Sequence, residues 1–233
     1  MKDLLKKYFS KYGIGANDVM INRFCDYYDY VIEENQKFNL TAITEKKDFA
    51  LKHFLDCAMP AKLINDSAKL LDIGAGAGFP SIPLKILRPD LNITMIDSLN
   101  KRVNFLNEVV QKLELKNITA IHTRAEDFAS KNREQYDVVI ARAVAGLNTL
   151  CEYCLPFVKV GGVFIAMKGS SYEQELNEAK NAIFVLGGEL LEVKPASIEE
   201  LDGERVNIVI KKVKETPAKY PRGKNLPRLK PIE

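Results

Sequence analysis

The sequence is poor in the residues that build disulfide frameworks and metal sites. It contains only four cysteines and two histidines in 233 residues. Cys151 and Cys154 are spaced as C-x-x-C, but no second pair follows at zinc-finger spacing, and His53 lies far from His122. We therefore expect no metal site and interpret the cysteines as small apolar residues, mostly on helices.

Long hydrophobic runs are also missing. No stretch approaches the roughly 20 apolar residues that cross a bilayer. Charges interrupt the apolar positions of residues 1–13, which is unlike a signal peptide. Hydrophobic residues nevertheless make up 46% of the chain and charged residues 28%, enough to bury a sizeable core. The composition predicts a folded cytoplasmic protein with no membrane partner, and we expect a monomer.

The net charge of +3 is unevenly distributed. Residues 211–233 contain eight basic and two acidic residues, so this segment carries +6 and the rest of the chain −3. Such a basic segment suggests a polyanionic partner such as nucleic acid; a tail kept basic for solubility is the alternative. The last residues are also rich in proline, so we expect them to be extended or loop-like.

Hydrophobic periodicity divides the chain into three parts. Residues 1–66 form a helical region, with helices expected over 18–37, where Asp18 suits the N-cap, and over 47–64. Residues 67–213 alternate short apolar runs with amphipathic segments, and residues 214–233 form the basic tail. The expected strands cover 69–73, 93–97, 118–122, 136–141, 163–168, 189–193 and 206–213. The helices between them cover 81–87, 101–115, 126–132, 147–158 and 172–186.

Alternation of strands and helices is typical of a parallel sheet covered on both faces. We therefore expect a doubly wound α/β fold with a seven-stranded, mostly parallel sheet and a small N-terminal helical appendage. The connection at 197–204 is short, so the last two strands should pair antiparallel.

The most informative motif is LLDIGAGAGFP at residues 70–80. An apolar strand ends at Asp72, and a helix should begin near Pro80. Between them alternate three glycines, Gly74, Gly76 and Gly78. Glycines let the chain turn sharply and let a ligand approach the backbone, and the helix N-terminus behind them offers free N–H groups. A purely structural glycine turn is the alternative.

The spacing of these glycines indicates which ligand they hold. The dinucleotide fingerprint G-x-G-x-x-G would need a third glycine where Phe79 stands, which disfavours a nicotinamide cofactor. The motif resembles instead the D/E-x-G-x-G-x-G loop of class I methyltransferases. In that family the strand-end carboxylate and the glycines hold the amino-acid part of S-adenosylmethionine.

Three further features follow at the carboxyl ends of strands, where open α/β sheets bind ligands. Asp97 ends the second strand and is placed to accept hydrogen bonds from both ribose hydroxyls, unless it or Ser98 only caps the next helix. Ala125 and Glu126 follow the third strand, where an adenine would lie; Glu126 could instead be favoured by the helix dipole. Arg142 ends the fourth strand beside the expected reaction centre, with a surface ion pair as the alternative.

The sequence offers little acid–base machinery for the reaction. After the fourth strand it has ARAVAG rather than the N/D-P-P-Y/F loop that receives an exocyclic amine, and no cysteine stands there to attack a pyrimidine. A nucleophile with a free lone pair needs no general base, and positioning alone can contribute roughly 7–11 kcal/mol. A purine ring nitrogen such as guanine N7 would suit this site.

Longer motifs resemble one family, the bacterial ribosomal RNA small-subunit methyltransferase G family, also called glucose-inhibited division protein B. The similarity runs nearly end to end. Its carriers are KFNLTAIT (37–44), KHFLDC (52–57), LLDIGAGAGFPSIPLKILRP (70–89), DSLNKRVNFL (97–106), TRAED (123–127), ARAVAGL (141–147), MKG (167–169) and YPR (220–222). The family often has serine where this chain has Cys57.

This resemblance implies an enzyme that uses S-adenosylmethionine to make 7-methylguanosine in the 530 loop of 16S rRNA, acting on the RNA, the small ribosomal subunit or an assembly intermediate. It assigns no catalytic residue. The cofactor site it implies falls on Gly74, Phe79, Asp97, Ser98, Leu99, Ala125, Glu126 and Arg142.

We expect RNA contacts from the rim of the sheet and from the tail. The candidates are Arg124, Arg142, Lys168, Lys219, Arg222 and Lys224. Asn39, Thr41, His53 and Asp56 should pack the helical appendage near the cofactor mouth. Two other functions remain open at this point: a non-catalytic RNA-binding module for ribosome assembly and an NAD(P)-dependent oxidoreductase.

Overall fold

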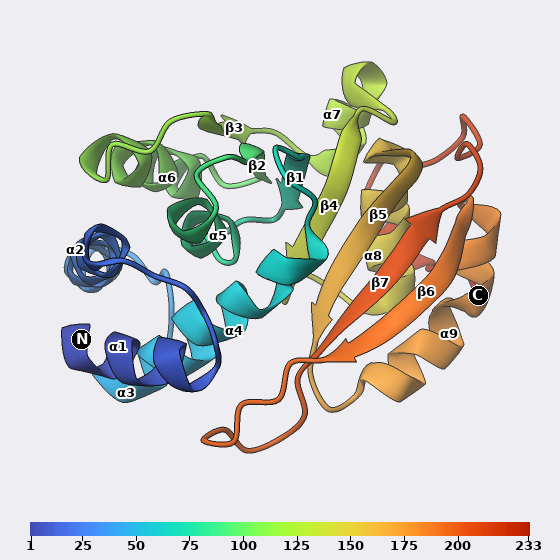
Figure 1. The fold of residues 1–233 in the computed structure, drawn as a ribbon. Coiled ribbons are helices and arrows are strands. Elements are labelled where there is room, and N and C mark those ends of the chain that lie inside the picture. The colour runs from blue at the N-terminus through green and yellow to red at the C-terminus, as the bar shows by residue number, and fades with distance from the viewer.

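Seven strands form one sheet in the order β3-β2-β1-β4-β5-β7-β6 (Figure 1). Neighbouring strands from β3 to β5 are parallel, and β7 is antiparallel to both β5 and β6. This computed structural model describes residues 1–233 and confirms the expected fold class and the terminal antiparallel pair. The strands are β1 (Lys69–Ile73), β2 (Asn92–Asp97), β3 (Ile118–His122), β4 (Tyr136–Arg142), β5 (Val158–Lys168), β6 (Gly188–Pro195) and β7 (Val206–Lys212).

The central strands separate two hydrophobic cores. Leu70 and Val138 belong to one core, whereas the next residues, Leu71 and Val139, belong to the other, because successive side chains on a strand point to opposite faces. Helices α5 (Ser81–Leu87) and α6 (Asn100–Lys112) cover the first face. The second face is covered by α7 (Ala125–Asn132), α8 (Leu147–Cys154) and α9 (Tyr172–Val185). The sheet is therefore doubly wound.

The N-terminal helices extend the first core. Tyr30 stacks on Phe105 of α6 with ring centroids 5.4 Å apart, and the Tyr27 hydroxyl donates to the carbonyl oxygen of Ala77. This hydrophobic core contains residues from both sides of the expected domain boundary between residues 66 and 67. The domain division stays a prediction. No helix is both long and apolar enough to span a membrane. The helical segments are α1 (Lys2–Lys11), α2 (Asp18–Asn35), α3 (Lys46–Phe49), a π-helical turn (Ala50–Leu55), α4 (Asp56–Ala58) and a 3-10 turn (Met59–Leu63).

Several helix ends were predicted wrongly, among them the end of α6, which lies at Lys112 and not at residue 115. Asn17, not Asp18, caps α2, because its side chain accepts a hydrogen bond from the Met20 N–H at 2.9 Å. Helix α8 ends at Cys154, before the expected residue 158. Pro156 lacks an amide hydrogen and cannot continue the helix, so a 3-10 turn leads directly into β5 at Val158.

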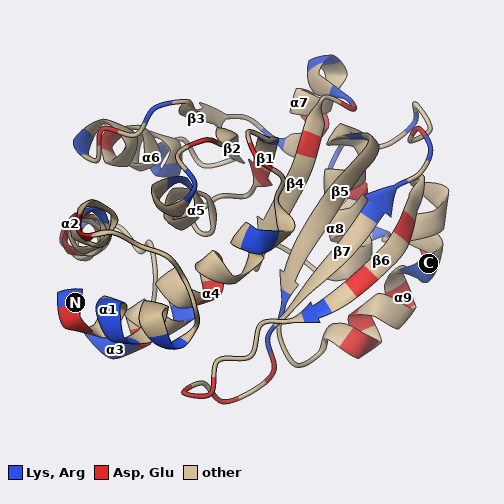
Figure 2. Ribbon diagram, viewed as in Figure 1, with Lys and Arg blue, Asp and Glu red and all other residues tan.

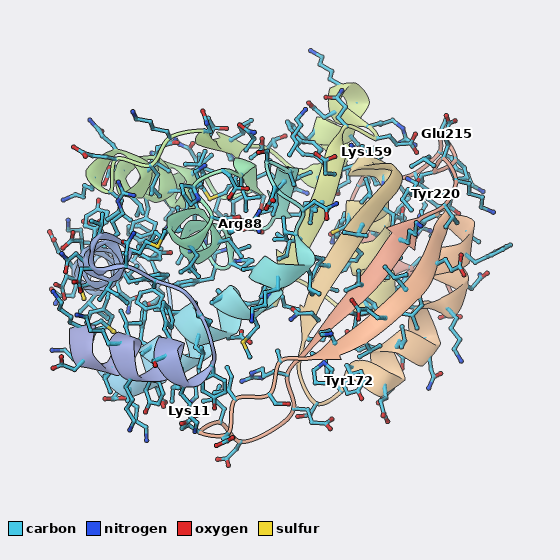
Figure 3. All side chains as sticks on the ribbon, viewed as in Figure 1. Lys11, Arg88, Lys159, Tyr172, Glu215 and Tyr220 are labelled. Atoms are coloured by element: carbon cyan, nitrogen blue, oxygen red, sulfur yellow. The ribbon has the colours of Figure 1, made fainter.

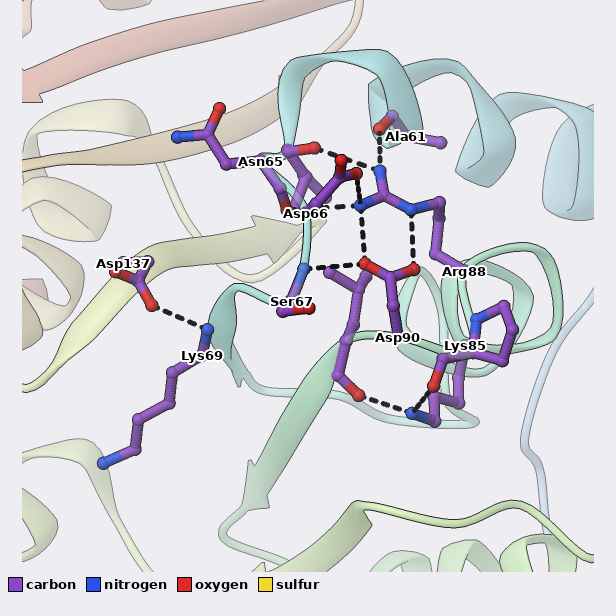
Figure 4. A network of polar contacts seen from close by, with 12 residues as sticks. Ala61, Asn65, Asp66, Ser67, Lys69, Lys85, Arg88, Asp90 and Asp137 are labelled. Atoms are coloured by element: carbon purple, nitrogen blue, oxygen red, sulfur yellow. Dashed lines mark hydrogen bonds and ion pairs between the residues drawn. The ribbon is translucent and has the colours of Figure 1, made fainter.

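A polar junction joins the N-terminal helices to the sheet (Figure 4). Its centre is Arg88, which directly follows α5 and pairs with Asp66 at 2.9 Å and with Asp90 at 2.8 Å. Its guanidinium also donates to three backbone carbonyls, those of Ala61, Ile64 and Asn65. The hydrogen bond from Arg88 holds the pKa of the Asp90 carboxyl well below its usual range. The junction thus fixes where β1 begins.

Helix α1 holds the long loop between β6 and β7. Lys11 pairs with Glu199 at 2.8 Å and with Glu200 at 2.7 Å, and Figure 3 shows Lys11 beside this loop. The Tyr12 hydroxyl donates to Glu200 and accepts from the Glu199 N–H. These contacts fix the loop that leads to Arg205, the residue before β7.

The C-terminal tail is anchored to α8, and the expectation of an extended or loop-like end was incomplete. The tail contains a one-turn helix, α10 (Leu226–Leu229). Arg222 grips the fully buried Glu152, with Nε 2.8 Å from Oε1 and Nη2 2.6 Å from Oε2. The Thr149 hydroxyl donates to the Pro227 carbonyl oxygen at 3.0 Å. A buried carboxylate needs a paired cation, which explains why this part of the basic tail folds back.

We expect Arg222→Ala to lower the free energy of unfolding by about 3 kcal/mol, because it leaves the buried Glu152 without its cation. The control is Lys6→Ala, which breaks an exposed ion pair with Asp18 and should have no measurable effect. Urea denaturation of both variants measures the difference. Equal stability of the two variants would show that the Arg222–Glu152 pair does not anchor the tail.

Candidate functional site

A cavity of about 560 Å³ lies at the carboxyl ends of β1, β2 and β4, the position where open α/β sheets bind ligands. Several residues that the sequence singled out line it: Gly74, Asp97, Ser98, Arg124, Ala125 and Glu126. They come from three separate turns, after β1, after β2 and at the start of α7. The topology therefore brings together five of the predicted cofactor residues, Gly74, Asp97, Ser98, Ala125 and Glu126.

Asp97 organises the floor of this first cavity. Its Oδ2 accepts the Gly76 N–H at 3.0 Å and its Oδ1 accepts the Leu99 N–H at 2.9 Å. Each carboxylate oxygen can accept two hydrogen bonds, so acceptor capacity remains for a ligand. Ser98 makes no capping bond; α6 begins after Leu99, which is exposed and does not line the cavity.

Gly74 has a positive φ of 75° and lies against the residues that follow β4. A Cβ added there would come within 2.7 Å of the Val144 side chain. Only glycine, which has no Cβ, lets the Val144 side chain come this close to the backbone.

Four predicted residues of the glycine loop, Asp72, Gly76, Gly78 and Phe79, do not line the cavity. Asp72 is completely buried: its Oδ2 accepts the Ser81 hydroxyl at 2.7 Å and its Oδ1 has no partner. Burial raises the pKa of Asp72 to about 7. Gly78 lies where a Cβ would meet Ile82 at 2.6 Å, and Phe79 is 6% exposed. The Asp72 carboxylate thus holds the start of α5, and its role in cofactor binding stays a prediction.

A second cavity, of about 570 Å³, adjoins the first and contains Arg142 in its wall. The Arg142 guanidinium makes three polar contacts with the N-terminal helical region. It donates to the Lys52 carbonyl oxygen at 3.0 Å, pairs with Asp56 Oδ2 at 3.1 Å and donates to His53 Nδ1 at 3.0 Å. Its carbon also lies 5.1 Å from the centre of the Phe79 ring. Arg142 lines the second cavity and does not reach the first.

These contacts fix the state of His53. A guanidinium can only donate, so Nδ1 must accept and Nε2–H must donate to the Thr41 hydroxyl, 2.9 Å away. Burial, helped by the positive charge of Arg142, lowers the pKa of His53 to about 3. The ring also stacks on Phe79 with centroids 4.2 Å apart. His53 is therefore a neutral, fully engaged residue with no nitrogen free to take a proton from a substrate.

Residues 143–146 separate the two cavities, and Ala143 and Val144 line both. Lys168 holds this loop by donating to the Ala145 carbonyl oxygen at 2.7 Å, and it pairs with Glu175 at 2.6 Å. From the other side Arg228 donates to the Val144 carbonyl oxygen at 3.1 Å. The two cavities are close neighbours. This arrangement allows a small group to pass from a molecule in one cavity to a molecule in the other.

Sequence reasoning missed part of the first cavity. Tyr153 of α8, Asn225 and Arg228 of the tail, and Arg102 of α6 also line it. The only sequence signal for the tail residues was their basic composition, which pointed to nucleic acid. The tail instead forms a wall of the cavity.

The other residues predicted to contact RNA have different surroundings. Arg124 is exposed on the rim, and Lys219 and Lys224 are exposed on the tail. Lys168 and Arg222 already have carboxylate partners, Glu175 and Glu152. Asn39 is exposed, whereas Thr41, His53 and Asp56 belong to the network around Arg142. No group of three or more possible metal-ligating side chains is present.

The same overall fold occurs in solved structures. M. jannaschii TYW2 in complex with AdoMet aligns with a TM-score of 0.57 and 19% identity, over 74% of this chain and 80% of that one. Precorrin-6y C5,15-methyltransferase from Geobacter metallireducens aligns with a TM-score of 0.53 and 18% identity, over 78% and 96%. At these identities the likeness concerns the fold alone.

Sequence comparison gives a closer relationship. A family model described as rRNA small subunit methyltransferase G matches residues 20–206. The ribosomal RNA small subunit methyltransferase G of Desulforamulus reducens is 54% identical over 213 residues, 90% of this chain and 89% of the relative. That of Lactobacillus johnsonii is 47% identical over 236 residues, 99% of each. The resemblance seen in the motifs is thereby confirmed, and the chain belongs to the rRNA small subunit methyltransferase G family.

Proposed function

We propose that this protein transfers a methyl group from S-adenosylmethionine to N7 of a guanine in the 530 loop of 16S rRNA. The observation that carries the proposal is the pair of adjoining cavities at the carboxyl ends of the strands, divided only by residues 143–146. One cavity would hold the methyl donor and the other the target base. The names of the relatives agree with a small-subunit ribosomal RNA substrate.

The first cavity fits S-adenosylmethionine in size and chemistry. Its volume of about 560 Å³ lies within the roughly 300–1,000 Å³ of small-molecule sites. The bare backbone at Gly74 would accommodate the methionine part, Asp97 would accept the ribose hydroxyls, and Ala125 with Glu126 would border the adenine. When bound, the cofactor supplies a methyl group activated by the positive charge on sulfur.

The residues around the second cavity support a nucleophile that carries no proton. Both nitrogens of His53 are engaged, by Arg142 and by Thr41, so this ring is no general base. Guanine N7 has a free lone pair and needs none. The task left to the protein is to hold donor and acceptor in line, which can contribute roughly 7–11 kcal/mol.

The rim around both cavities supplies the positive charge that an RNA backbone requires. Cations that line the cavities are Lys52, Arg102, Arg124, Arg142, Lys168, Arg205 and Arg228. Figure 2 shows acidic segments on β6 and α9 at the far edge of the sheet, which would repel RNA. We propose that the rim faces 16S rRNA or a small-subunit intermediate, that exposed Lys219 and Lys224 extend this contact, and that the protein acts in the cytoplasm.

The decisive experiment is mass mapping of 16S rRNA after incubation with the protein and S-adenosylmethionine. Unmodified RNA and unmodified small subunits should be compared, because the sequence does not indicate which is used. We expect one 7-methylguanosine in the 530 loop. Binding of RNA without any methyl transfer would instead favour the non-catalytic assembly module.

We expect Asp97→Ala to weaken binding of S-adenosylhomocysteine by about 1–3 kcal/mol, roughly 5- to 150-fold, because hydrogen bonds to a charged group are lost. Isothermal titration calorimetry measures the dissociation constant. Asp127→Ala is the matched control, since this acid lies in the first turn of α7 but outside the cavity. An unchanged affinity in Asp97→Ala would refute the ribose assignment.

The wall formed by the tail gives a second prediction for the same ligand. Arg228→Ala should weaken S-adenosylhomocysteine about fivefold, near 1 kcal/mol, because it removes a cavity-lining side chain and frees the Val144 carbonyl. Lys230→Ala removes a neighbouring exposed charge whose side chain makes no hydrogen bond or ion pair, and this variant should bind S-adenosylhomocysteine normally. Equal affinities of the two variants would assign the tail to RNA binding alone.

A further inference from the structure

The second cavity contains two charged groups with unused hydrogen-bonding capacity. Asp56 is 7% exposed, and its Oδ2 pairs with Arg142, but its Oδ1 makes no hydrogen bond within the chain. The Arg205 side chain is half-buried and makes neither a hydrogen bond nor an ion pair. Both residues line this cavity. A free acceptor and a free donor therefore face the same space.

Both groups are held in place by elements outside the cofactor cavity. Asp56 begins α4 and is fixed by Arg142 at the end of β4. Arg205 directly precedes β7, and its backbone carbonyl accepts the Ala196 N–H at 2.7 Å. The loop before it is tied to α1 through Lys11 and Tyr12. The N-terminal helices therefore set the positions of both groups.

We propose that Asp56 and Arg205 recognise the Watson–Crick edge of the target guanine, an inference that rests on the function proposed above. Guanine presents the O6 acceptor beside two donors, N1–H and the N2 amino group. Arg205 would donate to O6, and Asp56 Oδ1 would accept from N1–H and N2. Single-stranded RNA bases are commonly read on this edge.

The same pair rejects adenine. Adenine presents an amino group where guanine has O6 and an unprotonated N1 where guanine has N1–H. A donor would then meet Arg205 and an acceptor would meet Asp56, which leaves both protein groups unsatisfied, and such mismatches cost far more than a missing apolar contact. A phosphate is a poorer occupant, because it would meet the carboxylates of Asp56 and Glu175, which already pair with the cavity cations Arg142 and Lys168.

The proposed hydrogen bond from guanine N1–H to Asp56 also becomes stronger as the methyl group is transferred. The N7 lone pair forms the new N–CH₃ bond, the S–CH₃ bond breaks, and its electron pair stays on sulfur. Positive charge thus moves onto the purine without loss of a proton, and N1–H becomes a stronger donor. A hydrogen bond that strengthens in the transition state raises kcat more than it lowers KM.

The test uses unmodified small subunits whose 16S rRNA carries guanosine or inosine at the target position. Inosine keeps O6, N1–H and N7 but lacks the N2 amino group. Wild-type protein should prefer guanosine about tenfold in kcat/KM, the effect of roughly one hydrogen bond to a charged group. Asp56→Asn should lower kcat on guanosine by about 10- to 100-fold and reduce the preference to about one.

Two further variants separate recognition from structure. Arg205→Ala should slow guanosine and inosine equally and keep their ratio, because both bases carry O6. Glu175→Gln changes another acid of the same cavity and should also keep the ratio. Asp56→Asn should bind S-adenosylhomocysteine as tightly as wild type, which shows an intact first cavity.

The outcomes distinguish the two proposals. If wild-type protein methylates guanosine and Asp56→Asn keeps the tenfold preference, Asp56 does not read the base and this inference is overturned. If wild-type protein methylates no guanosine in the 530 loop, the function proposed above fails instead.

Discussion

The way the N-terminal helices pack on the sheet depends on the hydrogen bonds and the ion pair of the Arg142 guanidinium. This guanidinium ends a central strand, has a side chain only 15% exposed, and receives its acceptors from the N-terminal helical region: the Lys52 carbonyl, Asp56 and His53. Burying a cation is costly unless it is paired and hydrogen-bonded, so the helices and the sheet must meet in one way. The same contacts fix the tautomer of His53, and Arg142 forms part of the wall of the second cavity.

Most basic residues that line the cavities have side chains fixed by hydrogen bonds or ion pairs within the chain. Lys168 supports the loop at residues 143–146, and Arg228 supports it from the tail. Hydrogen bonds from two sides of the fold therefore hold the loop between the two cavities. A reaction that relies on alignment and needs no general base benefits from such fixed walls, because reacting atoms must lie within a few tenths of an ångström of their productive positions.

The two acids predicted to contact the cofactor, Asp72 and Asp97, have different contacts. Asp97 faces the first cavity and organises the backbone at Gly76 and Leu99. Asp72 lies beneath the loop, and its burial disfavours the charged form. Two acids near the ends of neighbouring strands thus have different environments, although the sequence predicted a cofactor contact for both.

The sequence by itself determined the sheet, its two-sided covering and the rim on which Gly74, Asp97 and Ala125 gather, because the carboxyl ends of parallel strands meet at one edge. Only the tertiary structure decided which charged residues are free. Arg222 and Lys219 are near neighbours in a basic tail, yet one is paired with a buried acid and the other is exposed. Asp56, Arg205 and Arg228 reach the cavities from distant parts of the chain. Local patterns report periodicity and composition, whereas the partner of a charge depends on long-range packing, and no local pattern contains that information.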